Sequence, residues 1–308
     1  MAALQRNNML TFFTTAKAFR GHDGVIQRNA LASWKFLHAD VEVILFGDDE
    51  GAAEVCAELG LRHEPEVVRH VSGAKYLNSI FARAQEIARH EYLCFSNCDI
   101  VLTADFRCAF ERAKDWREQF LLVSRRWDLD ITEPIHFERP EWARELRELA
   151  LADGHRQDES WIDFFLFRKG MYANMPAMIV GHCYWDNWMI WQALAEDAPV
   201  IDGDRFLVPV HQNHGYNPRF GRSKGVATDP LSQLNLRVIG GKRHVRRIDA
   251  ATHRIARDGR IRRVVIRNFY EPREWMRYNV WLPLRHGVLG ATRPLRTVLG
   301  LRSKAARP

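Results

Sequence analysis

Apolar runs with the composition of buried strands alternate with stretches of helical periodicity along this chain. The strand-like runs lie at Met9–Thr15, Val41–Phe46, Tyr92–Phe95 and Phe120–Ser124. Helical spacing is found between them, at Gly24–Leu37, Glu50–Leu59, Leu77–Ala88 and Asp105–Trp116. Strands that alternate with helices of this length imply β-α-β units. The sequence therefore predicts an α/β fold with a mainly parallel sheet.

The pattern becomes less regular after Arg126, where long connections are expected to carry the specific chemistry. Further elements are predicted as a strand resumed at Ile100–Leu102, a helix at Glu141–Leu151, a short strand at Asp163–Phe167, a helix at Trp185–Ala195 and a last strand at Phe206–Val210. Two final runs, Arg247–Ile255 and Arg260–Ile266, flank a turn sequence and predict a hairpin. We expect one domain at residues 1–216 and an extension at 217–308.

Charge is divided unevenly between these two parts. Residues 217–308 hold 22 Lys and Arg against 5 Asp and Glu, so this part carries +17 and the residues before it carry −10. Solvated surface arginines explain the imbalance as well as contact with an anionic membrane surface or acceptor does. The mixture of Trp, Leu and Arg in Trp275–Leu301 suits a peripheral membrane contact.

The composition also bears on where the protein works. No apolar run approaches the roughly 18 residues that span a bilayer, and Met1–Phe13 lacks the pattern of a secretion signal. The five cysteines form no C-x-x-C pair, which favours reduced thiols over a disulfide framework or a zinc site. We therefore expect a cytoplasmic protein that is free or peripheral on the inner face of the membrane.

Four polar clusters fall at the ends of apolar strand-like runs, at Thr14–Lys17, Gly47–Asp49, Ser96–Asp99 and His211–His214. Ligands of open α/β sheets bind outside the carboxyl ends of the strands, so one shared site is expected here. The chain has neither a G-x-G-x-x-G nor a G-x-x-x-x-G-K-[ST] loop to cradle phosphates. A diphosphate ligand would then need a cation to neutralise it.

Asp99 is the first candidate ligand for that cation, because it stands where a strand breaks after a short polar run. An aspartate in an ordinary turn is the alternative. His211 and His214 are predicted to assist it, and imidazole ligands suit Mn²⁺ better than Mg²⁺.

Several residues are candidates for binding a nucleotide or sugar. Asp48 or Asp49 could accept from a ribose hydroxyl, while the other would cap a helix. Arg125 and Arg126 could clamp an anion beside Trp127, or could be an ordinary surface pair. Lys75 and Asn78 open the strongest predicted helix, where anions are favoured, and Asp163 could accept from a ligand hydroxyl.

Asp186 is the candidate general base, at the start of the predicted helix Trp185–Ala195. The helix N-terminus lowers the pKa of such a carboxylate, while desolvation by the neighbouring tryptophans raises it. A first-turn aspartate beside packed tryptophans is the structural alternative.

With these residues placed, the chain resembles nucleotide-sugar glycosyltransferases of the GT-A type, related to the family-two enzymes. The matching stretches are FTTAKAF (13–19), VILFGDD (43–49), YLNSIFARAQ (76–85), FSNCDIVL (95–102), SRRWDLDIT (124–132), DFFLFRKG (163–170), WDNWMIW (185–191) and VPVHQNHGY (208–216). The resemblance implies a GT-A-like, Rossmann-type, mainly parallel sheet flanked by helices, with the basic extension and its hairpin following. It also implies a D-x-D-type metal site, but Asn97 replaces the first carboxylate here.

Together these features predict transfer of a sugar from a nucleotide diphosphate donor to a hydroxyl of a glycan or lipid-linked saccharide, as in polysaccharide biosynthesis. A divalent cation, Mn²⁺ or Mg²⁺, would be held by Asp99, His211 and His214. The donor would be bound by Thr14, Thr15, Lys17, Asp48, Asp49, Lys75, Asn78, Asn97 and Arg126, and the acceptor or sugar by Trp127, Asp163 and Trp185. Asp186 would be the base of an inverting reaction.

Two alternatives remain open. A sugar-nucleotide nucleotidyltransferase shares the fold class, but residues 13–24 lack the Gly-rich, Arg- and Lys-containing signature usual in those enzymes. A non-catalytic protein that binds glycans or nucleic acid through the basic extension is the other. Nucleic acid is not expected as a partner, since the arginines are not interleaved with a regular set of aromatics.

Overall fold

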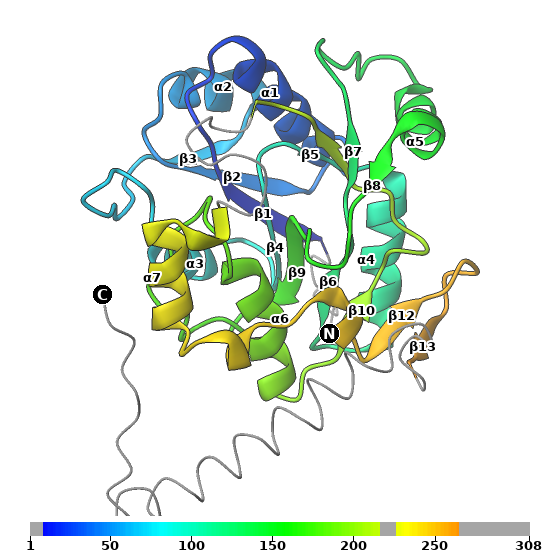
Figure 1. Ribbon diagram of the computed structural model, residues 1–308. Coiled ribbons are helices and arrows are strands. Elements are labelled where there is room, and N and C mark those ends of the chain that lie inside the picture. Colours follow the sequence, from blue (N-terminus) through cyan, green and yellow to red (C-terminus); the bar gives the residue numbers. More distant parts are fainter. Residues whose placement is uncertain (1–8, 216–225, 265–308) are drawn as a thin grey trace, which may run out of the picture. The chain divides into compact units, whose positions relative to one another are not determined.

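The computed structural model describes residues 9–215 and 226–264, and the described residues up to Arg263 belong to one compact unit. Its main feature is a nine-stranded sheet in the order β13-β12-β10-β6-β9-β4-β1-β2-β3 (Figure 1). The strands are β1 (Leu10–Thr15), β2 (Glu42–Phe46), β3 (Arg62–Glu64), β4 (Tyr92–Ser96), β6 (Leu121–Val123), β9 (Phe164–Arg168), β10 (Val200–Asp202), β12 (His253–Ile255) and β13 (Ile261–Arg263). All neighbours pair in parallel except around β9 and β13, so β3 and β13 form the two edges.

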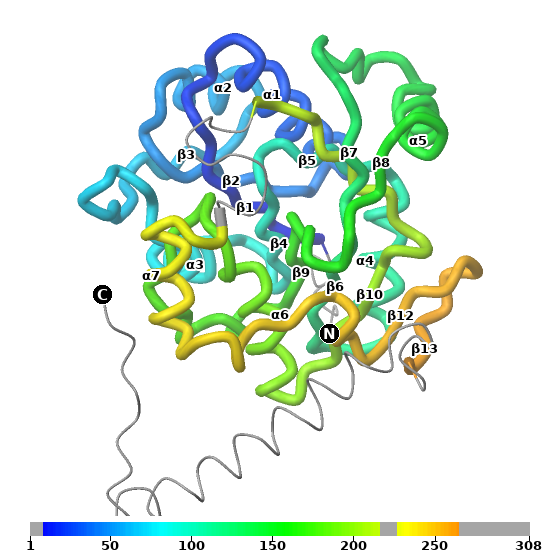
Figure 2. Tube along the Cα trace, in the orientation of Figure 1, coloured from blue at the N-terminus to red at the C-terminus, as the bar shows by residue number. Residues whose placement is uncertain are grey.

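Helices cover both faces of this sheet (Figures 1 and 2). They are α1 (Gly21–Lys35), α2 (Ala52–Leu59), α3 (Leu77–Ile87), α4 (Ala104–Trp116), α5 (Trp142–Asp153), α6 (Trp185–Ala195) and α7 (Pro230–Val238), with 3-10 turns at Val226–Thr228, Lys242–His244 and Ile248–Ala250. One apolar cluster joins the sheet to α3 and α6, and a second joins it to α1, α2 and α4. The mainly parallel sheet flanked by helices that the sequence predicts is confirmed.

Alternation along the central strands explains why both faces are covered. Phe12 of β1 packs into the cluster with α1 and α4, and the next residue, Phe13, packs into the cluster with α3 and α6. Leu45 and Phe46 of β2 divide in the same way. Successive side chains of a strand point to opposite faces, so a strand that is buried on both faces must be apolar at every position.

A second, four-stranded sheet has the order β5-β11-β7-β8. It contains β5 (Ile100–Val101), β7 (Trp127–Leu129), β8 (His155–Arg156) and β11 (Val210–Gln212). β11 lies in the middle, antiparallel to β5 and parallel to β7. A small apolar cluster that includes residues of α5 packs behind this sheet. The sheet thus brings together segments from three distant parts of the chain.

Several element boundaries agree with the sequence and several do not, among them the run Arg247–Ile255, which is a strand only at His253–Ile255. The helix Trp185–Ala195 has the predicted bounds, and Gly60 ends α2 in the left-handed conformation (φ 62°). The last strand, expected at Phe206–Val210, is instead Val210–Gln212, so His211 lies within a strand. The segment at Ile100–Leu102 does not resume β4 but leaves the large sheet to pair with β11. Short strands carry little periodic signal, which is why these boundaries shift.

The predicted hairpin is present as β12 and β13, and its turn is closed by a bond from the Ala256 amide to the Arg260 carbonyl (2.9 Å). β12 pairs in parallel with β10, which makes the hairpin part of the large sheet. The boundary expected at residue 216 stays a prediction, and the tail segment Trp275–Leu301 lies outside the described residues. Among the described helices, none has the length and apolar character required to cross a membrane.

Substitution of Trp34 tests the packing of α1 on the sheet. It is fully buried, stacks on Phe12 with ring centroids 5.1 Å apart, and donates from Nε1 to the Ile100 carbonyl oxygen (2.9 Å). We predict that Trp34→Ala lowers the free energy of unfolding by about 3–5 kcal/mol, because it leaves a cavity and an unpaired carbonyl. Urea denaturation measures this value. Phe36→Ala, at a side chain that is 58% exposed, is the control and should cost about 1 kcal/mol or less. Equal losses in the two variants would contradict the packing argument.

Candidate functional site

The second sheet places the side chains of Asp99, His211 and His214 together at the carboxyl end of β4. Asn97, Cys98 and Asp99 follow β4 directly and lead into β5. β11 pairs with β5 on one side and with β7 on the other, so that His211 lies opposite Ile100 and opposite Asp128. The amide of Gln212 also donates to the Asp99 carbonyl oxygen (3.2 Å). These pairings hold Asp99 beside the histidines of the following segment.

Asp99, His211 and His214 form the cluster that the sequence predicts as a metal site. One ligand atom from each of the three residues lies within 4.8 Å of the other two. Asp99 Oδ2 is 3.2 Å from His214 Nε2 and 3.6 Å from His211 Nε2. Asp99 Oδ1 is buried and has no hydrogen-bond partner within the described parts of the chain. A carboxylate oxygen without a partner beside two imidazole nitrogens is a donor set that fits a divalent transition ion such as Mn²⁺.

Electrostatics keep Asp99 ionised. Burial acts to raise its pKa, but the hydrogen bond from His214 and the charges of His211, His214 and Arg126 outweigh it and lower the pKa to about 2. An ionised carboxylate is the form that binds a cation. The Asp99 carboxyl group is therefore ionised throughout the physiological pH range.

Arg126 and Asp163 extend this cluster toward α6. The Arg126 guanidinium pairs with Asp128 (2.8 Å) and with Asp163 (2.9 Å), and it stacks over the ring of Trp161 at 4.5 Å. Asn97 Nδ2 donates to the other oxygen of Asp163 (2.5 Å). The structure thus brings together three predicted site residues, Asn97, Arg126 and Asp163, in one buried network.

Asp186 stands at the beginning of α6, as predicted. It is half-buried, and its Oδ1 is shielded from solvent without a hydrogen-bond partner in the part of the chain that the structure describes. Burial, assisted by the charge of Asp163, raises its pKa to about 7, although backbone amides at the helix start act in the opposite direction. Desolvation thus outweighs the helix terminus, the balance that the sequence could not decide. A carboxyl group with this pKa is poised to exchange a proton near neutral pH.

The predicted donor-binding residues after β1 and β2 lie at the carboxyl ends of strands that run parallel to β4. Lys75 Nζ pairs with Asp49 and donates to the Ala16 carbonyl oxygen (2.7 Å), and Asp48 pairs with Arg69. Gly47 permits the close approach, since it adopts φ 109° and a Cβ there would lie 2.7 Å from Asp49 Oδ2. Asp49 and Lys75 neutralise one another in this arrangement.

The other residues predicted to bind the nucleotide-sugar donor differ in how far their side chains are exposed to solvent. Thr14 is buried and donates to the Ser96 carbonyl oxygen (2.6 Å), which makes it a link between β1 and β4. Lys17 is exposed and pairs with Asp23 (3.2 Å). Side-chain oxygens of Thr15 and Asn78 are buried and lack a hydrogen-bond partner among the described residues.

Two predicted acceptor residues lie in apolar surroundings. Trp127 alternates with Asp128 along β7 and packs against the small cluster behind the second sheet, on the face opposite the histidines. Trp185 is buried and packs against Phe95 and Phe165 with ring centroids 5.3 Å away. Arg125 pairs with Asp204 (2.5 Å) and Glu159 (3.2 Å), so it does not join Arg126 in a clamp.

Four residues of this region were missed in the sequence, namely Arg69, Asp128, Gln157 and Trp161. Asp128 Oδ1 is 3.1 Å from His211 Nδ1, and Gln157 donates to the other oxygen of Asp128 (2.6 Å). Burial acts to raise the pKa of Asp128, but His211, Arg126 and Gln157 together lower it. The spacing Arg126-x-Asp128 could have indicated that Asp128 lies on the same face of a strand as the candidate residue Arg126, since alternate residues of a strand share a face.

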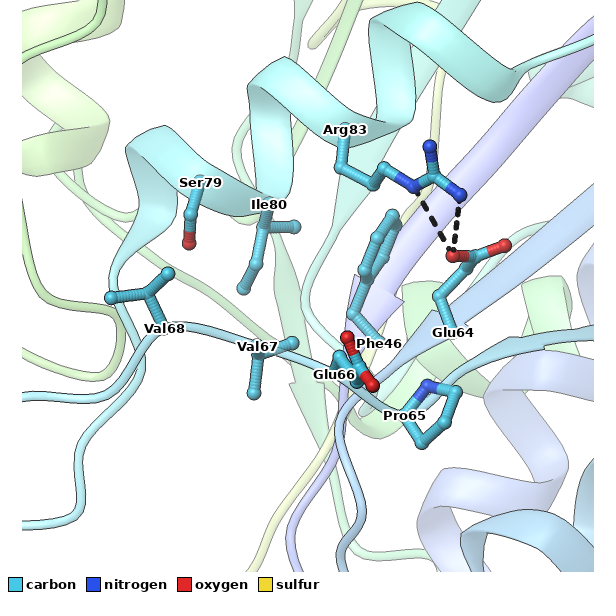
Figure 3. A pocket seen from close by; sticks show the side chains of 9 residues that line it. All are labelled: Phe46, Glu64, Pro65, Glu66, Val67, Val68, Ser79, Ile80 and Arg83. Carbon is cyan, nitrogen blue, oxygen red and sulfur yellow. Dashed lines mark hydrogen bonds and ion pairs between the residues drawn. The ribbon is translucent and has the colours of Figure 1, made fainter.

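A separate pocket of about 460 Å³ lies between α3 and the segment that follows β3 (Figure 3). The Arg83–Glu64 ion pair (3.2 Å) closes one side of it. Its lining residues are Phe46, Glu64, Pro65, Glu66, Val67, Val68, Ser79, Ile80 and Arg83. None of the predicted site residues belongs to this lining, so the pocket is distinct from the cluster around Asp99.

Comparison with known proteins gives similarity in fold only. No family model matches the chain, and no curated protein matches it. Among solved structures, it is similar to glucosyl-3-phosphoglycerate synthase from Mycobacterium tuberculosis in complex with Mn²⁺, UDP-glucose and phosphoglyceric acid, at 12% identity over 76% of this chain and 81% of that chain, with a TM-score of 0.46. It is also similar to S. aureus TarS 1–349 in complex with UDP-GlcNAc, at 10% identity over 68% of this chain and 59% of that chain, with a TM-score of 0.45. Similarity at this level carries no information on ligand or reaction.

The raised pKa of Asp186 predicts a specific pH dependence of stability. The native carboxyl group keeps its proton up to about pH 7, whereas the unfolded one loses it near the usual aspartate pKa of 3.8. The native state thus binds more protons in this window, and Asp186 lowers the free energy of unfolding progressively as pH rises through it. Asn resembles the protonated acid, so Asp186→Asn should stabilise the protein relative to wild type, more at pH 8 than at pH 5.

Urea denaturation of both proteins at these two pH values, in EDTA, measures the difference. Asp115→Asn is the matched control, because this side chain is 77% exposed. Its difference from wild type should be small and independent of pH. A difference for Asp186→Asn that is equal at pH 5 and pH 8 would contradict the raised pKa.

Proposed function

We propose that this protein is a glycosyltransferase that uses a nucleotide diphosphate sugar and a divalent cation. The observation that carries the proposal is the Asp99–His211–His214 cluster at the carboxyl end of β4, connected through Arg126 and Asp163 to the region of Asp186. A diphosphate leaving group requires a positive charge, and a hydroxyl nucleophile requires a base. The cluster and Asp186 supply residues suited to these two tasks.

In this mechanism Asp99, His211 and His214 would hold the cation, which supplies Lewis-acid stabilisation of the diphosphate. Asp186 would accept the proton of the acceptor hydroxyl at its unpartnered Oδ1. Asp163 raises the basicity of Asp186 through its negative charge, while Arg126 and Asn97 keep Asp163 itself in place. A base that acts directly on the acceptor is expected to give inversion at the anomeric carbon. Glycan or lipid-linked hydroxyls are the acceptor class that we propose.

The nucleotide is proposed to bind beside the carboxyl ends of β1 and β2, near Asp48, Asp49 and Lys75. Asp48 and Arg69 are exposed enough to exchange their mutual ion pair for contacts to a ligand. Burial is the largest influence on Lys75 and lowers its pKa, while Asp49 opposes the shift. A diphosphate near this lysine would reinforce its charged form.

Asp99→Ala is predicted to abolish metal-dependent nucleotide binding. A thermal-shift panel of UDP, GDP, ADP and CMP, each with Mn²⁺, Mg²⁺ or EDTA, measures it. A ligand at a hundredfold excess over its Kd adds about 2.7 kcal/mol of stability, which is several degrees in Tm for wild type. The variant should lose the metal-dependent part of the shift and keep its Tm in EDTA within a few degrees. Asp115→Ala on the surface of α4 is the control, with the wild-type response expected.

The results of this panel also separate the alternatives. A wild-type shift that is the same in EDTA would exclude the proposed cation role. The absence of a shift with every nucleotide would favour the non-catalytic binding protein. Consumption of a nucleoside triphosphate with a sugar phosphate would favour the nucleotidyltransferase.

Asp186→Asn is predicted to lower kcat by about 10²- to 10⁴-fold, the usual contribution of a general base, with donor affinity almost unchanged. Donor hydrolysis or transfer, measured with the nucleotide identified in the panel, gives kcat, and the thermal shift gives affinity. NMR of the product reports the anomeric configuration. Retained configuration, or wild-type kcat in the variant, would remove Asp186 from this role.

A further inference from the structure

His211 is the most buried member of the cluster, and each of its ring nitrogens faces a different carboxylate. Nε2 lies 3.6 Å from Asp99 Oδ2, and Nδ1 lies 3.1 Å from Asp128 Oδ1, with the ring only 1% exposed. A neutral imidazole carries one proton, on one of its two nitrogens. The nitrogen that binds a cation must be the one without it. The partner of the second nitrogen therefore decides whether His211 can serve as a ligand.

Sheet pairing fixes Asp128 in front of this ring. β7 and β11 are parallel neighbours, and Asp128 is the register partner of His211. Trp127 and Leu129, on either side of Asp128 in β7, pack into the apolar cluster behind the sheet. The alternation of the strand then directs Asp128 to the other face, toward the imidazole.

Among the described residues, the other side chains that approach the Asp128 carboxylate are those of Arg126 and Gln157, and each presents a nitrogen atom to it. Arg126 Nε lies 2.8 Å from Oδ1, and Gln157 Nε2 donates to Oδ2 at 2.6 Å. The guanidinium cannot accept a hydrogen bond. His211 Nδ1 and Asp128 Oδ1 lie 3.1 Å apart without the alignment of a hydrogen bond. An ionised carboxylate can form one with this imidazole only by accepting the Nδ1 proton, which would leave the lone pair on Nε2, beside Asp99.

We propose that Asp128 is a positioning residue, which fixes the Nδ1-protonated tautomer and the ring orientation of His211 so that Nε2 is presented to a cation at Asp99. The inference rests on the proposed cation-dependent function and adds a residue that does not itself touch the cation. Carboxylates that orient metal-binding histidines in this manner typically change metal affinity by about 10- to 100-fold.

Two substitutions at this position separate orientation from charge. Asp128→Asn removes the charge but keeps an oxygen that can accept from Nδ1, whereas Asp128→Ala removes both. The full-length protein is titrated with Mn²⁺ in the absence of nucleotide, and free Mn²⁺ is followed by its EPR signal. We expect Kd to rise about 10- to 100-fold in Asp128→Ala and only a few-fold in Asp128→Asn.

Asp130→Ala is the matched control. Asp130 stands two residues after Asp128, is exposed, and accepts from Asn213 Nδ2 (2.8 Å) without contact to an imidazole. This substitution removes one nearby negative charge and should change Kd by no more than a few-fold. An equal loss in Asp128→Ala, Asp128→Asn and Asp130→Ala would show that net charge acts, and would overturn the positioning role.

A spectroscopic measurement reports the tautomer directly. Long-range ¹H–¹⁵N NMR of the metal-free protein, assigned with His211→Gln, should show the Nδ1-protonated form in wild type and Asp128→Asn. Loss of this preference is expected in Asp128→Ala, with Tm in EDTA reporting whether that variant is folded. An Nε2-protonated His211 in wild type would overturn the inference even if Mn²⁺ binds. Failure of wild type to bind Mn²⁺ would instead contradict the proposed cation site as a whole.

Discussion

Burial of the central strands on both faces is the constraint from which the rest of the structure follows. β1, β2 and β4 are sandwiched between two apolar clusters, so polar side chains are largely excluded from their interiors. Polar groups needed for chemistry then have only the strand ends available. Asn97 and Asp99 after β4, and Asp48 and Asp49 after β2, occupy those ends. The position of the candidate site is thus a consequence of how the core is packed.

The small second sheet converts this position into a defined arrangement of side chains. Its strands are only two or three residues long and bury little surface. Their pairing instead fixes which residues of neighbouring strands lie opposite one another. Pairing of β11 with β5 and β7 sets His211 beside Asp99 and Asp128 at once. Side chains supported by backbone pairing on both sides lose little freedom when they bind a ligand, which favours a preorganised site.

The sequence predicts those parts of the fold that repeat a pattern over many residues. The α6 bounds and the order of the long strands follow from apolar periodicity. Asp99, His214 and Asp186 were identified because they stand at element ends, and His211 because a strand was expected to end just before it, although it lies within β11. β3, β7, β8 and β10 were missed, since two or three residues carry no period. The helix α7 was missed as well. Without β7, the alternation that separates Trp127 from Asp128 could not be used. The pairing of Asp128 with His211 joins residues more than eighty positions apart, and single-sequence patterns contain no information on such register.

The two edges of the large sheet also affect how copies of the protein behave toward one another. Within the described residues, one edge strand is β3, with Arg62 and Glu64, and the other is β13, with Arg262 and Arg263. An exposed edge presents unpaired amide and carbonyl groups, to which a strand of another molecule can add. At β13 such addition would bring Arg262 and Arg263 of two copies together, so like charges oppose it there. At β3 the edge carries one positive and one negative side chain, and Arg62 of one copy could lie opposite Glu64 of another. The two edges of the sheet therefore differ in how they would meet a second copy.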